Sequence, residues 1–173
     1  MKSFSQFLKE SSSGVKKLNC LYLHGLGAEV SQEVKESLSD YNLFYPQIDY
    51  DGTTKPYYEC LEIVNDNHID FIVGHSVGGV MAYWLAKEKN IPALLVFPAF
   101  GDEYTVYVSK SIKRYTPKML AVIGKEDEEV NPIEIRKKMS SQPNNAVIEI
   151  DSDHDIESKK LKRLAFEFCS TLK

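Results

Sequence analysis

The sequence lacks most features that mark membrane, disulfide-rich or nucleic-acid-binding proteins. No apolar run approaches the ~20 residues of a membrane span, and no secretory signal with an apolar core is recognisable. Three cysteines lie far apart in the 173 residues, without metal-ligand spacing, so we expect free thiols in a reducing compartment. The net charge of −4 gives no general attraction to nucleic acid. We therefore expect a cytoplasmic protein that binds neither membranes nor nucleic acid.

What the sequence does contain is the composition of an ordinary globular protein. Apolar residues make up 43% and charged residues 27% of the chain, which is typical of a soluble domain. The length fits one domain with one sizeable core. Because Ser11-Ser12-Ser13-Gly14 is a flexible joint, we expect a leading segment at 1–14 and the domain at 15–173.

The order of apolar patterns predicts the fold class. Runs with the length of strands lie at 18–23, 43–48, 69–73, 93–97, 119–123 and 146–150. Helical spacings of apolar residues separate most of these runs, and a last helical stripe follows the sixth. This alternation predicts an α/β fold with a mostly parallel sheet of about six strands, covered on both faces. In such folds the active residues gather at the carboxyl ends of the strands.

One connection between strands departs from this alternation of strands and helices. Residues 99–117 are longer than a single crossover helix requires, and they hold three tyrosines. They form either a small lid or a short crossover helix packed through Val106, Val108 and Ile112.

The most informative motif is Gly74-His75-Ser76-Val77-Gly78-Gly79. It follows the apolar run 70–73 and precedes a helical pattern at 80–89. A serine hydroxyl is a weak nucleophile, and a tight strand-to-helix turn exposes it to a base and to a backbone N–H. The glycines two residues before and after the serine leave room for that turn. The motif predicts that Ser76 is a catalytic nucleophile.

The base for this serine is chosen by elimination among four histidines. His75 adjoins Ser76, and its side chain should point away from the catalytic proton. His24 belongs to another motif, and His68 precedes a strand at the wrong end of the sheet. His154 follows the strand at 146–150, on a loop at the carboxyl end, and this position suits a general base.

Two other interpretations of His154 remain open. The residue could be an ordinary exposed loop histidine. Its neighbours Asp151, Asp153 and Asp155 also admit a cation site, although acidic loops are usually only solvated and no other ligand cluster is evident.

A carboxylate that orients the base is expected in Gly124-Lys125-Glu126-Asp127-Glu128-Glu129, after the strand at 119–123. We assign the role to Asp127, because its short side chain suits a fixed loop position. The three glutamates of the loop are the alternatives. The order Ser76, Asp127, His154 agrees with the order of a triad on this kind of sheet.

Two backbone N–H groups should bind the oxyanion. Val77, directly after the nucleophile, supplies the first, and we assign the second to Leu26 in the glycine turn at 22–27. That turn lacks the Lys-Ser/Thr of a phosphate-binding P-loop and the spacing of a dinucleotide fingerprint.

Together these residues resemble the α/β-hydrolase superfamily, and in particular its short YqiA-type esterases with minimal or no lid. The resemblance implies a three-layer sandwich, a Ser76, Asp127, His154 triad and hydrolysis of short-chain esters. The acidic neighbours of His154 depart from the small residues usual there. Besides the triad, the resemblance rests on Tyr22-Leu23-His24-Gly25, Tyr45-Pro46-Gln47-Ile48, the Ser76 motif with Tyr83-Trp84-Leu85 after it, and Ile91-Pro92-Ala93 leading to Pro98-Ala99.

Residues 1–10 resemble the leader peptides that target internal head proteins to the prohead of T4-like phages, which are cut after Leu-x-Glu, here Leu8-Lys9-Glu10. This resemblance implies packaging in a capsid. The alternative is an amphipathic first helical turn that docks on the domain.

The sequence as a whole predicts a carboxylesterase-like serine hydrolase that acts on a small acyl substrate and needs no metal or organic cofactor. Because little chain is available for a lid, we expect a shallow, open site bordered by Phe97, Phe100 and Tyr104. The alternatives are a thioesterase or peptidase with the same triad, and a non-catalytic binding protein on this fold, such as a phage internal protein.

Overall fold

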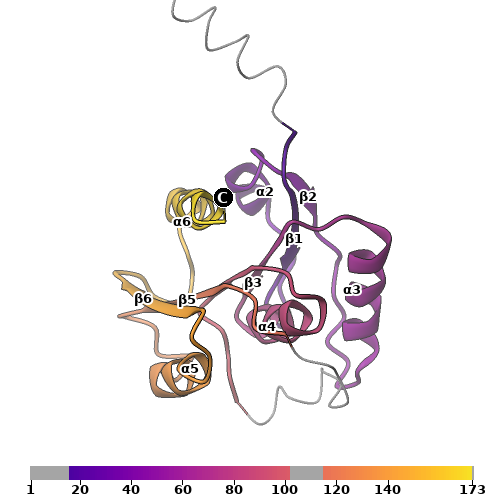
Figure 1. Cartoon of the computed structure of the whole chain (residues 1–173). Coiled ribbons are helices and arrows are strands. Elements are labelled where there is room, and N and C mark those ends of the chain that lie inside the picture. The colour runs from indigo at the N-terminus through magenta and orange to yellow at the C-terminus, as the bar shows by residue number, and fades with distance from the viewer. Residues whose placement is uncertain (1–15, 102–114, 173) are drawn as a thin grey trace, which may run out of the picture.

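The computed structural model describes residues 16–101 and 115–172, which form an α/β fold around one sheet (Figure 1). All six strands are parallel, in the order β2-β1-β3-β4-β5-β6. The predicted fold class is therefore confirmed. The strands are β1 (Asn19–Leu23), β2 (Asn42–Phe44), β3 (Phe71–His75), β4 (Ala93–Val96), β5 (Met119–Gly124) and β6 (Asn145–Ile150). The helices are α2 (Gln32–Ser37), α3 (Lys55–Asp66), α4 (Val77–Lys89), α5 (Pro132–Met139) and α6 (Ser158–Ser170).

Three predictions concern residues that the structure does not describe. The phage-like leader at 1–10, Tyr104 and most of the proposed lid or crossover helix at 99–117 lie outside the residues that the structure describes.

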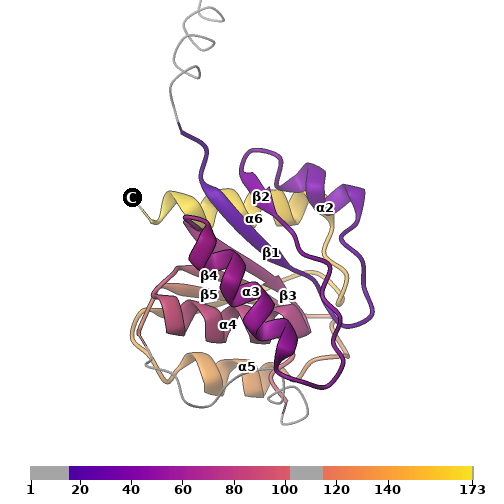
Figure 2. The same ribbon diagram turned by 90° about the vertical axis from the view of Figure 1, so that its right-hand side faces the viewer.

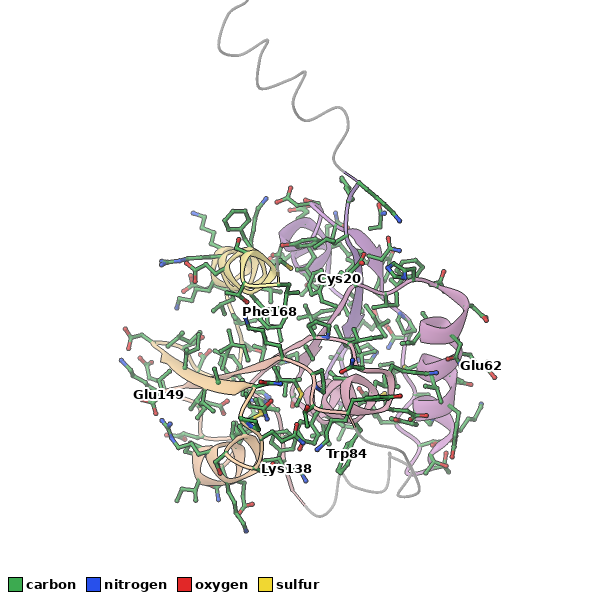
Figure 3. The ribbon with its side chains drawn as sticks, viewed as in Figure 1. Cys20, Glu62, Trp84, Lys138, Glu149 and Phe168 are labelled. Atoms are coloured by element: carbon green, nitrogen blue, oxygen red, sulfur yellow. The ribbon has the colours of Figure 1, made fainter. Side chains whose placement is uncertain are left out.

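The helices cover the sheet on both faces, which gives three layers. Helices α2 and α6 lie on one face, and α3, α4 and α5 lie on the other (Figures 1 and 2). In Figure 3, Phe168 of α6 points toward the sheet, whereas Glu62 and Glu149 lie at the outside. Phe168 is buried, as are the other members of the predicted apolar stripe within α6. This helix therefore docks through the face that its sequence predicts.

Burial on both faces explains the composition of the central strands. Every residue of β4 is buried, and so are Phe71, Ile72 and Val73 of β3, which is why these strands are continuous apolar runs rather than alternating ones. The edge strands differ, because β2 and β6 contain exposed positions. Strand β2 ends at Phe44 and not near residue 48, since Pro46 has no N–H to continue the ladder.

The order of the strands creates a crevice at the carboxyl edge of the sheet. From β1 the chain runs outward to β2 and then returns to form β3 on the other side of β1. The strand order therefore reverses between β1 and β3, and ligands of open α/β sheets bind at such a reversal. Leu23 at the end of β1 pairs with Gly74 of β3, so the loop after β1 lies beside the Ser76 turn. Among the described residues, no helix has the length and apolar character needed to cross a bilayer.

Candidate active site

Ser76 occupies a strained turn between β3 and α4. Its φ of 56° and ψ of −120° are unusual for a residue with a side chain, and such a conformation costs about 1–3 kcal/mol. Backbone hydrogen bonds hold it: the Ser76 N–H donates to the Val96 carbonyl at 3.0 Å, and the Ser76 carbonyl accepts from Gly79 at 2.9 Å and from Ala99 at 3.1 Å. Strand β4 and its following loop therefore fix the turn.

Gly74 and Gly78, on either side of Ser76, lie too close to neighbouring atoms to carry a side chain. A methyl group on Gly74 would lie 2.7 Å from the Cβ of Ala82, and one on Gly78 would lie 2.6 Å from the carbonyl carbon of Leu23. Both distances are shorter than van der Waals contact. The turn needs glycine at these two positions because α4 lies so close to β3 and to the end of β1.

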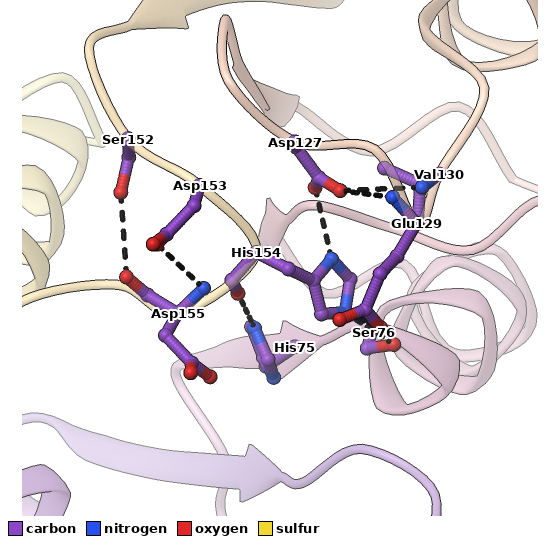
Figure 4. Close-up of polar contacts among 9 residues, drawn as sticks. All are labelled: His75, Ser76, Asp127, Glu129, Val130, Ser152, Asp153, His154 and Asp155. Carbon is purple, nitrogen blue, oxygen red and sulfur yellow. Dashed lines mark hydrogen bonds and ion pairs between the residues drawn. The ribbon is translucent and has the colours of Figure 1, made fainter.

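The structure brings Ser76, His154 and Asp127 into one chain of hydrogen bonds (Figure 4). The Nδ1 of His154 lies 2.9 Å from Oδ2 of Asp127, and its Nε2 lies 3.0 Å from Oγ of Ser76. Because a carboxylate only accepts, Nδ1 carries the proton and Nε2 offers its lone pair to the serine hydroxyl. The His154 side chain is 13% exposed, whereas that of Asp127 is 1% exposed. This arrangement can remove a proton from Ser76.

The loop after β5 explains why the carboxylate at Nδ1 of His154 belongs to Asp127 and to none of the neighbouring glutamates. Oδ1 of Asp127 accepts the backbone N–H groups of Glu129 at 2.8 Å and Val130 at 3.2 Å. These bonds fix the carboxylate and leave Oδ2 for His154. Glu126 and Glu128 are exposed, and Glu129 reaches His154 from the solvent side, with Oε2 3.7 Å from Nε2.

The loop after β1 lies against Ser76, where the oxyanion site was expected. A methyl group on Gly25 would lie 3.7 Å from Oγ of Ser76. The ring of His24 fixes this loop: its Nε2 accepts the N–H of Ile48 at 2.8 Å, so its Nδ1–H donates to the Gly25 carbonyl at 2.7 Å. Leu26 follows and is exposed.

The other expected donor, Val77, is the first residue of α4. An N–H in the first turn of a helix has no partner within the helix. The Val77 N–H is therefore available beside Ser76, and the positive end of the α4 dipole lies at the same place.

His75 has a role that the sequence analysis missed. It is not at the catalytic proton, but its Nε2–H donates to the backbone carbonyl of His154 at 2.9 Å. Its ring also packs edge-on against Phe97, with centroids 5.9 Å apart. Burial lowers the pKa of His75, which favours the neutral ring. Its position next to the nucleophile was the only sign of this role in the sequence, because a side chain there lies near the loop that carries His154.

Of the three residues expected to border the substrate, Phe97 and Phe100 lie in different places. Phe97 is fully buried and adopts a φ of 47°, and its ring centroid lies 6.0 Å from that of His154. Phe100 is partly buried and stacks edge-on against Tyr83. It lines a cavity of about 360 Å³ between α4 and α5. Tyr104 is outside the described residues.

The aspartates around His154 do not converge on a common point. Asp151 forms an ion pair with Lys125 at 2.7 Å, and Asp153 accepts the backbone N–H of Asp155. Within 16–101 and 115–172, no group of three or more His, Cys, Asp or Glu side chains is arranged to hold a metal ion. The described residues therefore give no support to the alternative of a cation site at this loop.

Comparison with known proteins supports the fold at low sequence identity. No family model matches the sequence, and no curated protein matches it. Solved structures do match. Est1E from Butyrivibrio proteoclasticus is 17% identical over 92% of this chain and 91% of that chain, with a TM-score of 0.67. SOBER1 from Arabidopsis thaliana is 14% identical over 91% and 100%, with a TM-score of 0.71.

XCC1541 from Xanthomonas campestris pv. campestris, described as a hydrolase of the α/β superfamily, is 12% identical over 90% of this chain and 99% of that chain, with a TM-score of 0.68. At these identities the likeness is one of fold. The chain has the α/β-hydrolase fold.

Proposed function

We propose that this protein is a serine hydrolase that cleaves small carboxylic esters through an acyl-enzyme. The observation that carries the proposal is the hydrogen-bonded chain from Asp127 through His154 to Ser76, on a strained turn at the crevice of the sheet. Structures of the same fold that carry the name esterase, among them the esterase domain of a Rhodothermus marinus protein, agree with this activity class. Fold alone does not fix a reaction, so the proposal depends on the site.

In the first half of the reaction, Oγ of Ser76 attacks the acyl carbonyl while Nε2 of His154 takes the hydroxyl proton. The carbonyl electron pair moves onto oxygen, and the N–H groups of Leu26 and Val77 stabilise that oxyanion. Asp127 stabilises the imidazolium without taking its proton. The tetrahedral intermediate collapses, the bond to the leaving alkoxide breaks, and His154 returns the proton to it.

In the second half, water replaces the leaving group. Nε2 of His154 removes a proton from the water, the hydroxide attacks the acyl-enzyme, and a second tetrahedral intermediate forms at the same oxyanion site. Its collapse releases the acid and returns the proton to Oγ of Ser76. The two half-reactions therefore balance with Ser76, His154, the backbone donors and one water molecule.

The test is covalent labelling with a fluorophosphonate probe, which reacts with an activated serine. We expect the parent protein to be labelled at Ser76, and Ser76→Ala and His154→Ala to remain unlabelled while keeping their circular dichroism spectra. Folded parent protein without labelling would contradict the proposal and favour a binding protein on this fold.

The acyl and leaving groups are tested by competition. We expect p-nitrophenyl acetate to be cleaved with an initial burst of nitrophenol, because the acyl-enzyme accumulates when its hydrolysis is slower than its formation. Matched ester, thioester and amide substrates then separate an esterase from a thioesterase or a peptidase. A strong preference for long-chain over short-chain esters would contradict the small acyl group.

A further inference from the structure

Glu129 places a carboxylate at the reacting atoms, although the proposed mechanism does not use it. Its Oε2 lies 3.7 Å from Nε2 of His154, which in turn is 3.0 Å from Oγ of Ser76. Figure 4 shows the side chain extending from the loop after β5 toward the serine. The backbone of Glu129 is fixed, because its N–H donates to Asp127. The carboxylate is 72% exposed and faces the solvent side of the site.

The carboxylate of Glu129 lies where the leaving group of the substrate is expected. In the proposed reaction Nε2 of His154 gives its proton to the leaving oxygen, so that oxygen must come within hydrogen-bond reach of Nε2. Substituents on the leaving oxygen then extend into the space beside Glu129. For a charge two or three bonds from that oxygen, we assume a separation of about 6 Å from the carboxylate, at which two unit charges still interact in water.

The described surroundings do not neutralise Glu129. Within the part of the chain that the structure describes, the only basic side chain within 4.0 Å of its carboxylate is His154, which is charged only when its ring is protonated. The nearest basic residue along the loop, Lys125, is paired with Asp151. Glu128, the preceding residue in the loop, is also an exposed carboxylate, but no ion pair joins it to His154 among the described residues. Among the described residues, Glu129 is therefore the glutamate of this loop whose charge lies beside Nε2 of His154.

We propose that Glu129 is a specificity-determining residue that favours esters of amino alcohols, whose leaving groups carry a positive charge, over neutral or anionic esters. This inference rests on the proposed hydrolase function and adds the class of leaving group. The carboxylate contributes through charge and not by taking part in proton transfer. A unit charge at this distance, in partly solvated surroundings, changes relative rates by about three- to tenfold at low ionic strength.

The experiment uses two acetates of nearly equal shape, 2-(trimethylammonio)ethyl acetate and neutral 3,3-dimethylbutyl acetate. The measure is the ratio of their kcat/KM values, compared between variants, because the two esters differ in intrinsic reactivity. We expect Glu129→Gln to lower the cationic-to-neutral ratio by about three- to tenfold and Glu129→Lys to lower it further. High salt should reduce the difference. Glu128→Gln is the matched control and should leave the ratio unchanged.

The possible outcomes are distinguishable. Hydrolysis of both esters with the same ratio in the parent and in Glu129→Gln would overturn the role of Glu129 and leave the hydrolase proposal intact. An equal change in Glu128→Gln would also overturn it, because a diffuse acidic field would then be responsible. Labelling of Ser76 without cleavage of either acetate would overturn this leaving-group class alone. Absence of both labelling and cleavage would overturn the hydrolase proposal and this inference together.

Discussion

Replacement of Gly78 by alanine tests how closely activity depends on the contact between α4 and the loop after β1. The added Cβ would lie 2.6 Å from the carbonyl carbon of Leu23, and ordinary contact begins at 3.4 Å. The added Cβ would lie closer still to the carbonyl oxygens of Leu23 and His24. Because all of these atoms belong to the backbone, the helix start and the end of β1 must separate by roughly 1 Å. Overpacking of this kind costs about 1–3 kcal/mol of the free energy of unfolding.

The same shift should reduce turnover as well as stability. Ser76 and Val77 move with α4, whereas Leu26 stays with β1, so the serine and the two oxyanion donors lose their mutual geometry. A misplacement near 1 Å can reduce turnover by about 10²-fold. The assay combines urea unfolding with kcat for p-nitrophenyl acetate under conditions in which both proteins are folded.

Gly52→Ala is the control for this prediction. Gly52 has a φ of 80° and no atom within 4 Å of an added Cβ, so its substitution costs about 1 kcal/mol through backbone strain alone. We expect its kcat to equal that of the parent. A Gly78→Ala variant with parental stability and kcat would refute the argument that close packing at this position supports the site.

Three further predictions concern other groups. Asp127→Asn should lower kcat for p-nitrophenyl acetate by about 10⁴-fold with a small change in the urea midpoint, because the amide no longer fixes the Nδ1–H tautomer of the base; loss of activity that follows loss of folding would contradict this. Burial lowers the pKa of His75 from 6.5, so the unfolded chain binds an extra proton below that value and the free energy of unfolding falls as the pH decreases. His75→Gln should show a smaller fall between about pH 7.5 and about pH 5.5 in urea titrations, and an unchanged fall would rule this group out. Burial raises the pKa of Cys60 to about 12 and that of Cys20 well above its usual value; iodoacetamide should therefore label both thiols only in urea, as mass spectrometry can show.

The fold was predictable because its signals are local. Apolar runs bounded by turn residues predicted a strand at each of the six positions. Asn131-Pro132 is likewise a local signal for a helix start, because asparagine is a favoured N-cap and proline a favoured first residue, and the side chain of Asn131 caps α5. Boundaries were less accurate. Strand β3 begins at Phe71 and continues to His75, beyond the apolar run, because the ladder with β4 extends to that residue.

The spatial relations within the site depended on tertiary structure. Chain order and loop position were enough to nominate Ser76, Asp127 and His154 as neighbours. The hydrogen bond from His75 to the carbonyl of His154 spans 79 residues, and no local pattern encodes it. The approach of Glu129 to the base likewise depends on the direction of one side chain.

The sheet order also divides the site into parts with different local stability. The nucleophile, the loop after β1 and the acid follow inner strands, whereas the base follows β6, at one edge. Edge elements open more readily than central ones in the native ensemble. Fraying of β6 and α6 would therefore withdraw His154 while Ser76 stays in its strained turn. Turnover then reports on the order of β6 and α6, and hydrogen exchange at β6 should rise in step with lost activity.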